Sequence, residues 1–143
     1  MADTRVHTRK DIEDVTDMPF LADLPVAKEK KKKKGEEDKL TTAYSNSKAK
    51  SFTEAMRLMC TNIDFMRPEG CAHPVLATTS FASSAGKTFV ATNIAACLAD
   101  AKKKVVFVDM DLRKRTASQF FSLKHKTRGL SNYIFDESLP LDE

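Results

Sequence analysis

An apolar run, a Gly-Lys-Thr turn, a helical pattern and a second apolar run follow one another between residues 75 and 109. Residues 75–79 predict a short buried strand, residues 86–101 a largely buried helix, and residues 105–109 a second strand. This order forms a βαβ unit, in which the crossover is right-handed and the two strands are parallel. We therefore expect an α/β fold in which helices flank a parallel sheet. Two strands are fewer than a sheet usually has, so the sheet is expected to be incomplete at the C-terminus.

The turn at residues 83–88 has the chemistry of a polyphosphate site. The first N–H groups of a helix lack partners, and the helix dipole adds positive charge there. Gly86 allows close backbone approach, Lys87 supplies a charge for phosphate, and Thr88 supplies a hydroxyl for Mg²⁺. The general pattern G-x-x-x-x-G-K-[ST] would need a glycine where this chain has Phe81, so the loop is a variant. The alternative is a chance tripeptide at a strand-to-helix turn.

Paired carboxylates end the second predicted strand. Asp109 and Asp111 stand at the carboxyl end of that strand, which is the edge where α/β sheets bind ligands. Two carboxylates with one residue between them can flank Mg²⁺ directly or through water. The alternative is a polar turn that caps the next helix. Their position on the strand after the Gly-Lys-Thr turn favours the metal site.

A helix is strongly predicted over residues 51–66, because apolar side chains recur at helical spacing. Ser51 and Glu54 form a capping-box pattern at its start. Shorter helices are predicted over residues 116–123 and from residue 129 to 134. The apolar stripe of the long helix consists of Phe52, Met56, Met59, Ile63 and Met66.

The chain divides by composition near residue 46. Residues 1–46 predict a flexible, charged N-terminal extension with a lysine-rich linker that includes Lys30 to Lys34. An apolar island at residues 18–26 contains two prolines and should be extended, and it could dock on the folded part. Residues 47–143 predict the N-terminal part of a larger domain.

Charge and cysteine content limit the function classes. The formal net charge is +4, which the lysine-rich linker alone could supply, so we do not expect nucleic-acid binding. The three cysteines have no C-x-x-C spacing, which argues against a zinc site or a disulfide framework and favours a reducing cytosol. Neither a signal-peptide pattern nor an apolar run of about 18 residues is present, so we do not expect the chain to span a membrane.

At these motifs the sequence resembles the bacterial tyrosine kinases of capsule and exopolysaccharide synthesis. These kinases have P-loop ATPase folds related to the MinD/ParA class. The Asp-x-Asp-x-Arg element is similar to the Walker A′ motif of that family. The resemblance extends from about residue 51 to 134 and is carried by Glu54-Ala-Met-Arg57 with Thr61-Asn62, by Ser83-Ser-Ala-Gly-Lys-Thr88, by Val106-Phe-Val-Asp109-Met-Asp111-Leu-Arg113 and by Gly129-Leu-Ser-Asn-Tyr133.

The resemblance implies an autophosphorylating, ATP-dependent protein-tyrosine kinase that regulates polysaccharide synthesis and export. Its implied partners are a transmembrane polysaccharide co-polymerase that acts as activator, tyrosine substrates that include the kinase itself, and a homo-oligomer. Its implied place is the inner face of the plasma membrane. The residues that the resemblance implies for ATP binding are Ser83, Ser84, Ala85, Gly86, Lys87, Thr88 and Phe89. Those implied for Mg²⁺ are Thr88, Asp109 and Asp111, and those implied for catalysis are Lys87, Asp109 and Asp111. Glu54 and Arg57 are implied for oligomerisation.

The chain also departs from the family pattern. Cys60 replaces the last cation of the family's Glu-x-x-Arg-x-x-Arg oligomerisation motif. A Walker B strand and a tyrosine cluster are not evident, since Tyr44 and Tyr133 are the only tyrosines. Two alternatives therefore remain: a non-catalytic truncated kinase that serves as an interaction module, and a MinD/ParA-like positioning ATPase.

Overall fold

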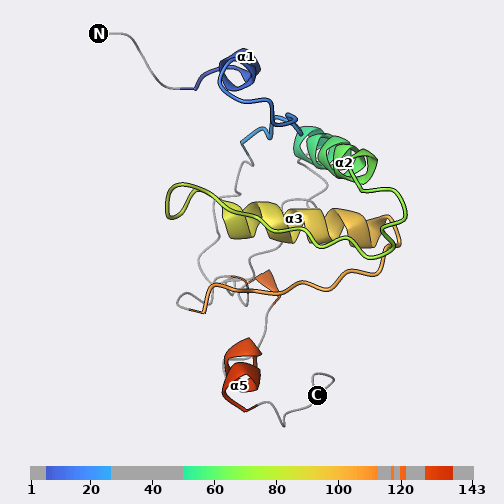
Figure 1. Ribbon diagram of the computed structural model, residues 1–143, viewed down its shortest axis with the longest axis vertical. Coiled ribbons are helices and arrows are strands. Elements are labelled where there is room, and N and C mark those ends of the chain that lie inside the picture. The colour runs from blue at the N-terminus through green and yellow to red at the C-terminus, as the bar shows by residue number, and fades with distance from the viewer. Residues whose placement is uncertain (1–5, 27–49, 113–116, 118–119, 122–127, 137–143) are drawn as a thin grey trace, which may run out of the picture.

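The computed structural model describes residues 6–26, 50–112, 117, 120–121 and 128–136 (Figure 1). Its helices are α1 (Arg9–Glu13), α2 (Lys50–Phe65), α3 (Lys87–Asp100) and α5 (Leu130–Phe135). The helices predicted over 51–66, 86–101 and from residue 129 are confirmed as α2, α3 and α5. The lysine-rich linker and most of the helix predicted over 116–123 lie outside the described residues. None of the described helices is long and apolar enough to cross a bilayer.

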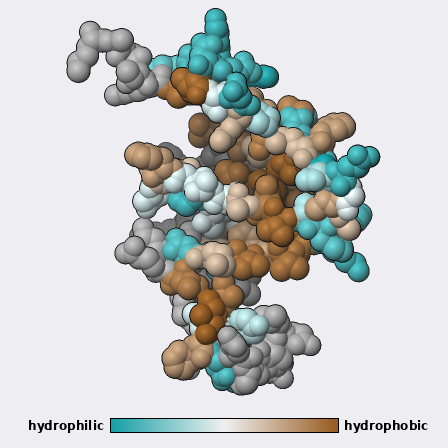
Figure 2. Space-filling view, viewed as in Figure 1, coloured by the Kyte–Doolittle hydropathy of each residue, from teal (hydrophilic) through white to brown (hydrophobic). Residues whose placement is uncertain are grey.

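The core of the described structure lies between α2 and α3. The apolar residues of α2 recur at a spacing that places them on one face, whereas α3 has few polar residues and is apolar around most of its circumference. The rings of Phe52 on α2 and Phe89 on α3 pack with centroids 5.6 Å apart. In Figure 2 the apolar colour gathers over the central part of the molecule, around α3 and the segments beside it. The buried side chains of this cluster are Phe52, Met56, Met59, Cys60, Ile94 and Cys97.

The start of α2 differs from the prediction. The helix already includes Lys50, so Ser51 lies inside the helix instead of at its N-cap. Lysine is a good helix former and extends the helix beyond the first apolar residue. At the other end, Met66 lies beyond the last helical residue and is about half exposed, whereas Ile63 packs partly against the core.

The two predicted strands are not formed as strands among the described residues. Segments 74–80 and 103–111 are extended and run in the same direction, opposite to α3 (Figure 1). No backbone hydrogen bond joins these two described segments. Val75 is 96% exposed and Val106 is 88% exposed, so the expected burial is also missing. A strand exists only where a neighbouring backbone completes its ladder, and neither segment has such a neighbour in the described part of the chain.

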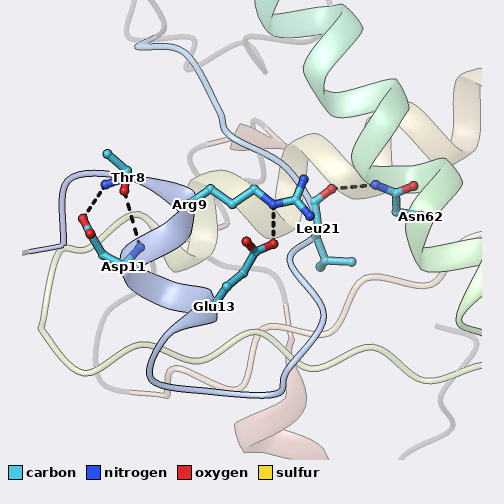
Figure 3. A network of polar contacts seen from close by, with 6 residues as sticks. All are labelled: Thr8, Arg9, Asp11, Glu13, Leu21 and Asn62. Carbon is cyan, nitrogen blue, oxygen red and sulfur yellow. Dashed lines mark hydrogen bonds and ion pairs between the residues drawn. The ribbon is translucent and has the colours of Figure 1, made fainter.

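The N-terminal residues 6–26 contain an ordered helix that the sequence analysis did not predict. The Thr8 side chain accepts a hydrogen bond from the Asp11 N–H, and the Asp11 carboxylate accepts one from the Thr8 N–H, which forms a capping box for α1. These two contacts and the ion pair between Arg9 and Glu13 are drawn in Figure 3. A five-residue helix of this kind depends on its cap more than on helix propensity.

The apolar island docks on the core. Leu21, Ala22 and Leu24 pack against the α2–α3 cluster. The Asn62 side-chain amide donates a hydrogen bond to the Leu21 carbonyl at 2.7 Å (Figure 3). A backbone carbonyl in an extended segment has no helical partner, so this bond satisfies it. The division of the chain near residue 46 stays a prediction.

Candidate functional site

The loop before α3 ends in a left-handed residue. Gly86 is the N-cap of α3 and has φ 94° and ψ 11°. A Cβ added at Gly86 would meet no atom within 4 Å, so the backbone conformation and not the available space requires glycine there. Ser84 also has a positive φ of 62°. The loop therefore holds two left-handed residues within three positions, which turns the chain sharply into the helix.

Among the described residues, no acceptor pairs with the first backbone N–H groups of α3. No side chain caps the helix, and its first intrahelical bond runs from the Val90 N–H to the Gly86 carbonyl at 2.8 Å. Lys87, Thr88 and Phe89 precede that bond, so their N–H groups have no helical acceptor. Together with the helix dipole, these groups form a site that favours an anion.

Lys87 is the first residue of α3, and its side chain folds back across the loop. The ammonium donates a hydrogen bond to the Ser80 hydroxyl at 3.1 Å. Ser80 in turn donates to the Ala82 carbonyl at 2.9 Å. Ser80 is a polar contact of the loop that the sequence analysis missed. The one sequence feature that could have indicated this contact is a hydroxyl side chain on the last residue before the loop.

Thr88 and Phe89 follow Lys87 and differ in which of their groups a ligand could reach. The Thr88 carbonyl accepts a hydrogen bond from the Thr92 hydroxyl at 2.8 Å. The Phe89 ring packs on Phe52 in the core, and its carbonyl accepts from the Asn93 amide at 2.7 Å. Phe89 can therefore reach a ligand only through its backbone N–H.

Asp109 and Asp111 form a tight turn at the end of the second extended segment. The Asp111 N–H donates to an Asp109 carboxylate oxygen at 3.0 Å. Segment 103–112 runs back along α3 towards the end where the helix begins (Figure 1). A helix of 14 residues is about 21 Å long. Nine extended residues span up to about 30 Å, which is enough to return to that end. The end of this segment therefore lies at the same end of α3 as the loop.

The donors at this end suit a phosphate-bound magnesium ion better than a metal held by protein alone. No group of three or more His, Cys, Asp or Glu side chains among the described residues could hold a metal. Mg²⁺ usually takes one or two carboxylates and completes its shell with water and phosphate oxygens. The hydroxyl of Thr88 and the carboxylates of Asp109 and Asp111 have the right chemistry for that arrangement.

The predicted oligomerisation residues lie on α2 and do not belong to the loop site. The Arg57 guanidinium lies 3.6 Å from a carboxylate oxygen of Asp100 on α3. Both side chains are more than half exposed, so the pair contributes little to stability. Glu54 is exposed on the same helix. The role of Glu54 and Arg57 in oligomerisation stays a prediction.

Comparison with known proteins shows what this chain is similar to. Residues 76–132 match the family described as the CobQ/CobB/MinD/ParA nucleotide binding domain. The chain is 35% identical over 86 residues to the tyrosine-protein kinase Etk of Escherichia coli strain K12. It is 34% identical over 86 residues to the tyrosine-protein kinase CpsD of Streptococcus agalactiae. Each alignment covers 60% of this chain. No solved structure matches the chain.

The resemblance predicted from the sequence is confirmed. The chain is related to the bacterial tyrosine-protein kinases and carries part of a P-loop nucleotide-binding domain, whose family has an α/β fold. It spans only 12% of the length of Etk and 36% of the length of CpsD.

Proposed function

We propose that the chain acts as an ATP-dependent protein-tyrosine kinase that regulates capsular or extracellular polysaccharide synthesis and export. The observation that carries the proposal is the position of Lys87. It begins an uncapped helix directly after the left-handed Gly86, at the end of α3 to which segment 103–112 runs back. The names of the relatives support phosphoryl transfer to tyrosine as the reaction.

In this proposal the residues of the loop have separate roles. The backbone N–H groups of residues 83–89 and the Lys87 ammonium bind and orient the phosphates of ATP. Thr88, Asp109 and Asp111 hold Mg²⁺, which would neutralise charge on the phosphates. One of the two aspartates accepts the proton of the tyrosine hydroxyl. The tyrosine oxygen then bonds to the γ-phosphorus, the bond from phosphorus to the β–γ bridging oxygen breaks, and ADP leaves.

The proposed setting follows the family resemblance. We infer a transmembrane polysaccharide co-polymerase as activator, protein tyrosines as substrates, the chain itself among them, and a homo-oligomer that involves Glu54 and Arg57. The expected location is peripheral, at the inner face of the plasma membrane. The exposed position of both residues on α2 is compatible with a contact to another subunit.

A phosphorylation assay tests the proposal. The purified chain is incubated with Mg²⁺ and ATP labelled at the γ-phosphate, and phosphotyrosine is measured on the chain and on an added tyrosine peptide. Lys87→Met should lower the rate by at least about a hundredfold, because an electrostatic clamp on the transferring group is lost. Lys10→Met, which changes an exposed lysine on α1, should leave the rate unchanged. Absence of phosphotyrosine, or equal rates for Lys87→Met and the unaltered chain, would contradict the proposal.

A positioning ATPase is the second candidate, because the matched family also takes its name from MinD and ParA. Such a protein would also bind Mg²⁺–ATP through Lys87. Release of free phosphate without any phosphotyrosine in the same assay would favour this second function.

A further inference from the structure

We propose that Ser80 is a positioning residue that holds the Lys87 ammonium in place for the phosphates of the nucleotide. The inference rests on the proposed function in one respect, namely that Lys87 binds phosphate. It adds a residue that stands outside the Gly-Lys-Thr turn and that acts on the ligand only through Lys87.

The hydrogen bond between Lys87 and Ser80 connects the residues on either side of the loop. Ser80 is the last residue before the loop of residues 81–86, and Lys87 is the first residue after it. The Lys87 Nζ to Ser80 Oγ distance of 3.1 Å therefore joins the two ends of the loop through a half-buried contact. A lysine side chain has four rotatable bonds and loses considerable rotamer freedom when it binds a ligand. A partner that already restricts the side chain lowers that loss when phosphate arrives.

The hydroxyl of Ser80 is oriented to accept. A serine hydroxyl has one proton, and Ser80 donates it to the Ala82 carbonyl at 2.9 Å. The oxygen lone pairs are then left for the Lys87 ammonium. The two hydrogen bonds form a chain from Lys87 through Ser80 to the loop backbone, so the position of the ammonium is linked to the conformation of the loop.

The contact leaves the charge of Lys87 available. Ser80 is neutral, and no carboxylate of the described residues forms an ion pair with Lys87. An ammonium has three donor hydrogens, of which Ser80 takes one. Two hydrogens remain for phosphate oxygens, so the contact with Ser80 can persist when the nucleotide binds. Ser80 therefore positions Lys87 and does not compete with phosphate for it.

An isosteric pair of variants tests this role. Threonine and valine have the same shape, and only threonine keeps the hydroxyl. The dissociation constant for Mg²⁺–ATP is measured by titration calorimetry for the unaltered chain, Ser80→Thr and Ser80→Val. Ser80→Thr should bind within about twofold of the unaltered chain, and Ser80→Val should bind about threefold to tenfold more weakly, as expected for one hydrogen bond. Ser80→Ala gives a second comparison that adds no bulk to the loop.

A double-mutant cycle separates positioning from a general effect on the loop. In the Lys87→Met background, the exchange of threonine for valine at position 80 should not change the dissociation constant, because the ammonium is absent. Circular dichroism establishes that every variant keeps its helices. An equal loss with and without the lysine would overturn the proposal, since Ser80 would then support only the loop.

The remaining outcomes are also decisive. Equal binding of Ser80→Thr and Ser80→Val, or tighter binding of Ser80→Val and Ser80→Ala, would overturn the role of Ser80. The proposed function would stay intact if Lys87→Met binds Mg²⁺–ATP more weakly than the unaltered chain. Failure of the folded, unaltered chain to bind Mg²⁺–ATP would overturn both proposals.

Discussion

At the scale of single residues, Gly86 is a position where backbone conformation alone favours glycine. Its φ of 94° lies in the region that side chains disfavour, although its surroundings are open. A residue with a Cβ would be strained in this conformation or would shift the loop. A shift would move the N–H groups of α3 away from an incoming phosphate.

We therefore predict that Gly86→Ala lowers the free energy of unfolding by roughly 1–2 kcal/mol and weakens Mg²⁺–ATP binding. Denaturant unfolding and titration calorimetry measure the two effects. Gly129→Ala is the matched control, because Gly129 has an extended backbone with φ −150° and equally open surroundings. Equal effects of the two substitutions would show that the left-handed conformation is not what Gly86 contributes.

At the scale of elements, the α2–α3 pair is the main source of stability in the described structure. Met56 is fully buried in this interface, whereas Leu58, two residues further along α2, is 56% exposed. We predict that Met56→Ala lowers the free energy of unfolding by about 2–5 kcal/mol, because it removes buried surface and leaves a cavity. Leu58→Ala should change it by less than about 0.5 kcal/mol. Urea unfolding followed by circular dichroism compares the two, and similar losses would contradict the assigned interface.

The same interface contains a thiol whose ionisation is suppressed. Burial raises the pKa of Cys60 from 9.0 to about 12, and the neighbouring Cys97 thiol and the Asp64 carboxylate act in the same direction against a smaller opposite effect of Lys103. Below pH 9 the thiol is neutral in both the folded and the unfolded chain. Between pH 9 and about 12 it ionises only in the unfolded chain, so stability is lost as the pH rises.

We predict that the unaltered chain loses more stability between pH 8 and pH 10 than Cys60→Ala does. Urea unfolding at pH 8 and pH 10 measures this difference in stability. The contributions of the other titrating groups cancel because both chains contain them. The partly exposed Cys71 should react with iodoacetamide in the folded chain, while the buried Cys60 and Cys97 react only after unfolding. Equal pH dependence in both chains would mean that Cys60 is accessible to water in the folded state.

At the scale of the whole molecule, the sequence predicted local features well and most non-local ones poorly, with the docking of the apolar island as the exception. The helices α2, α3 and α5 follow from periodicity and turn residues near each segment. The loop chemistry likewise follows from Gly86, Lys87 and Thr88. The two strands were not realised in the described residues, because a strand depends on partners elsewhere in the chain. Ser80 and the Asn62 contact to Leu21 were missed for the same reason, since each joins residues separated by a loop or a linker.

The central claim is that the loop before α3 and the carboxylates of Asp109 and Asp111 bind one Mg²⁺–nucleotide complex. The most direct measurement is the change of backbone amide resonances when Mg²⁺–ATP is added to the isotope-labelled chain. We expect the amides of residues 86–88 and of residues 109–111 to shift together with one dissociation constant, while those of α1 stay unchanged. Shifts confined to one of the two segments, or no shifts at all, would contradict it.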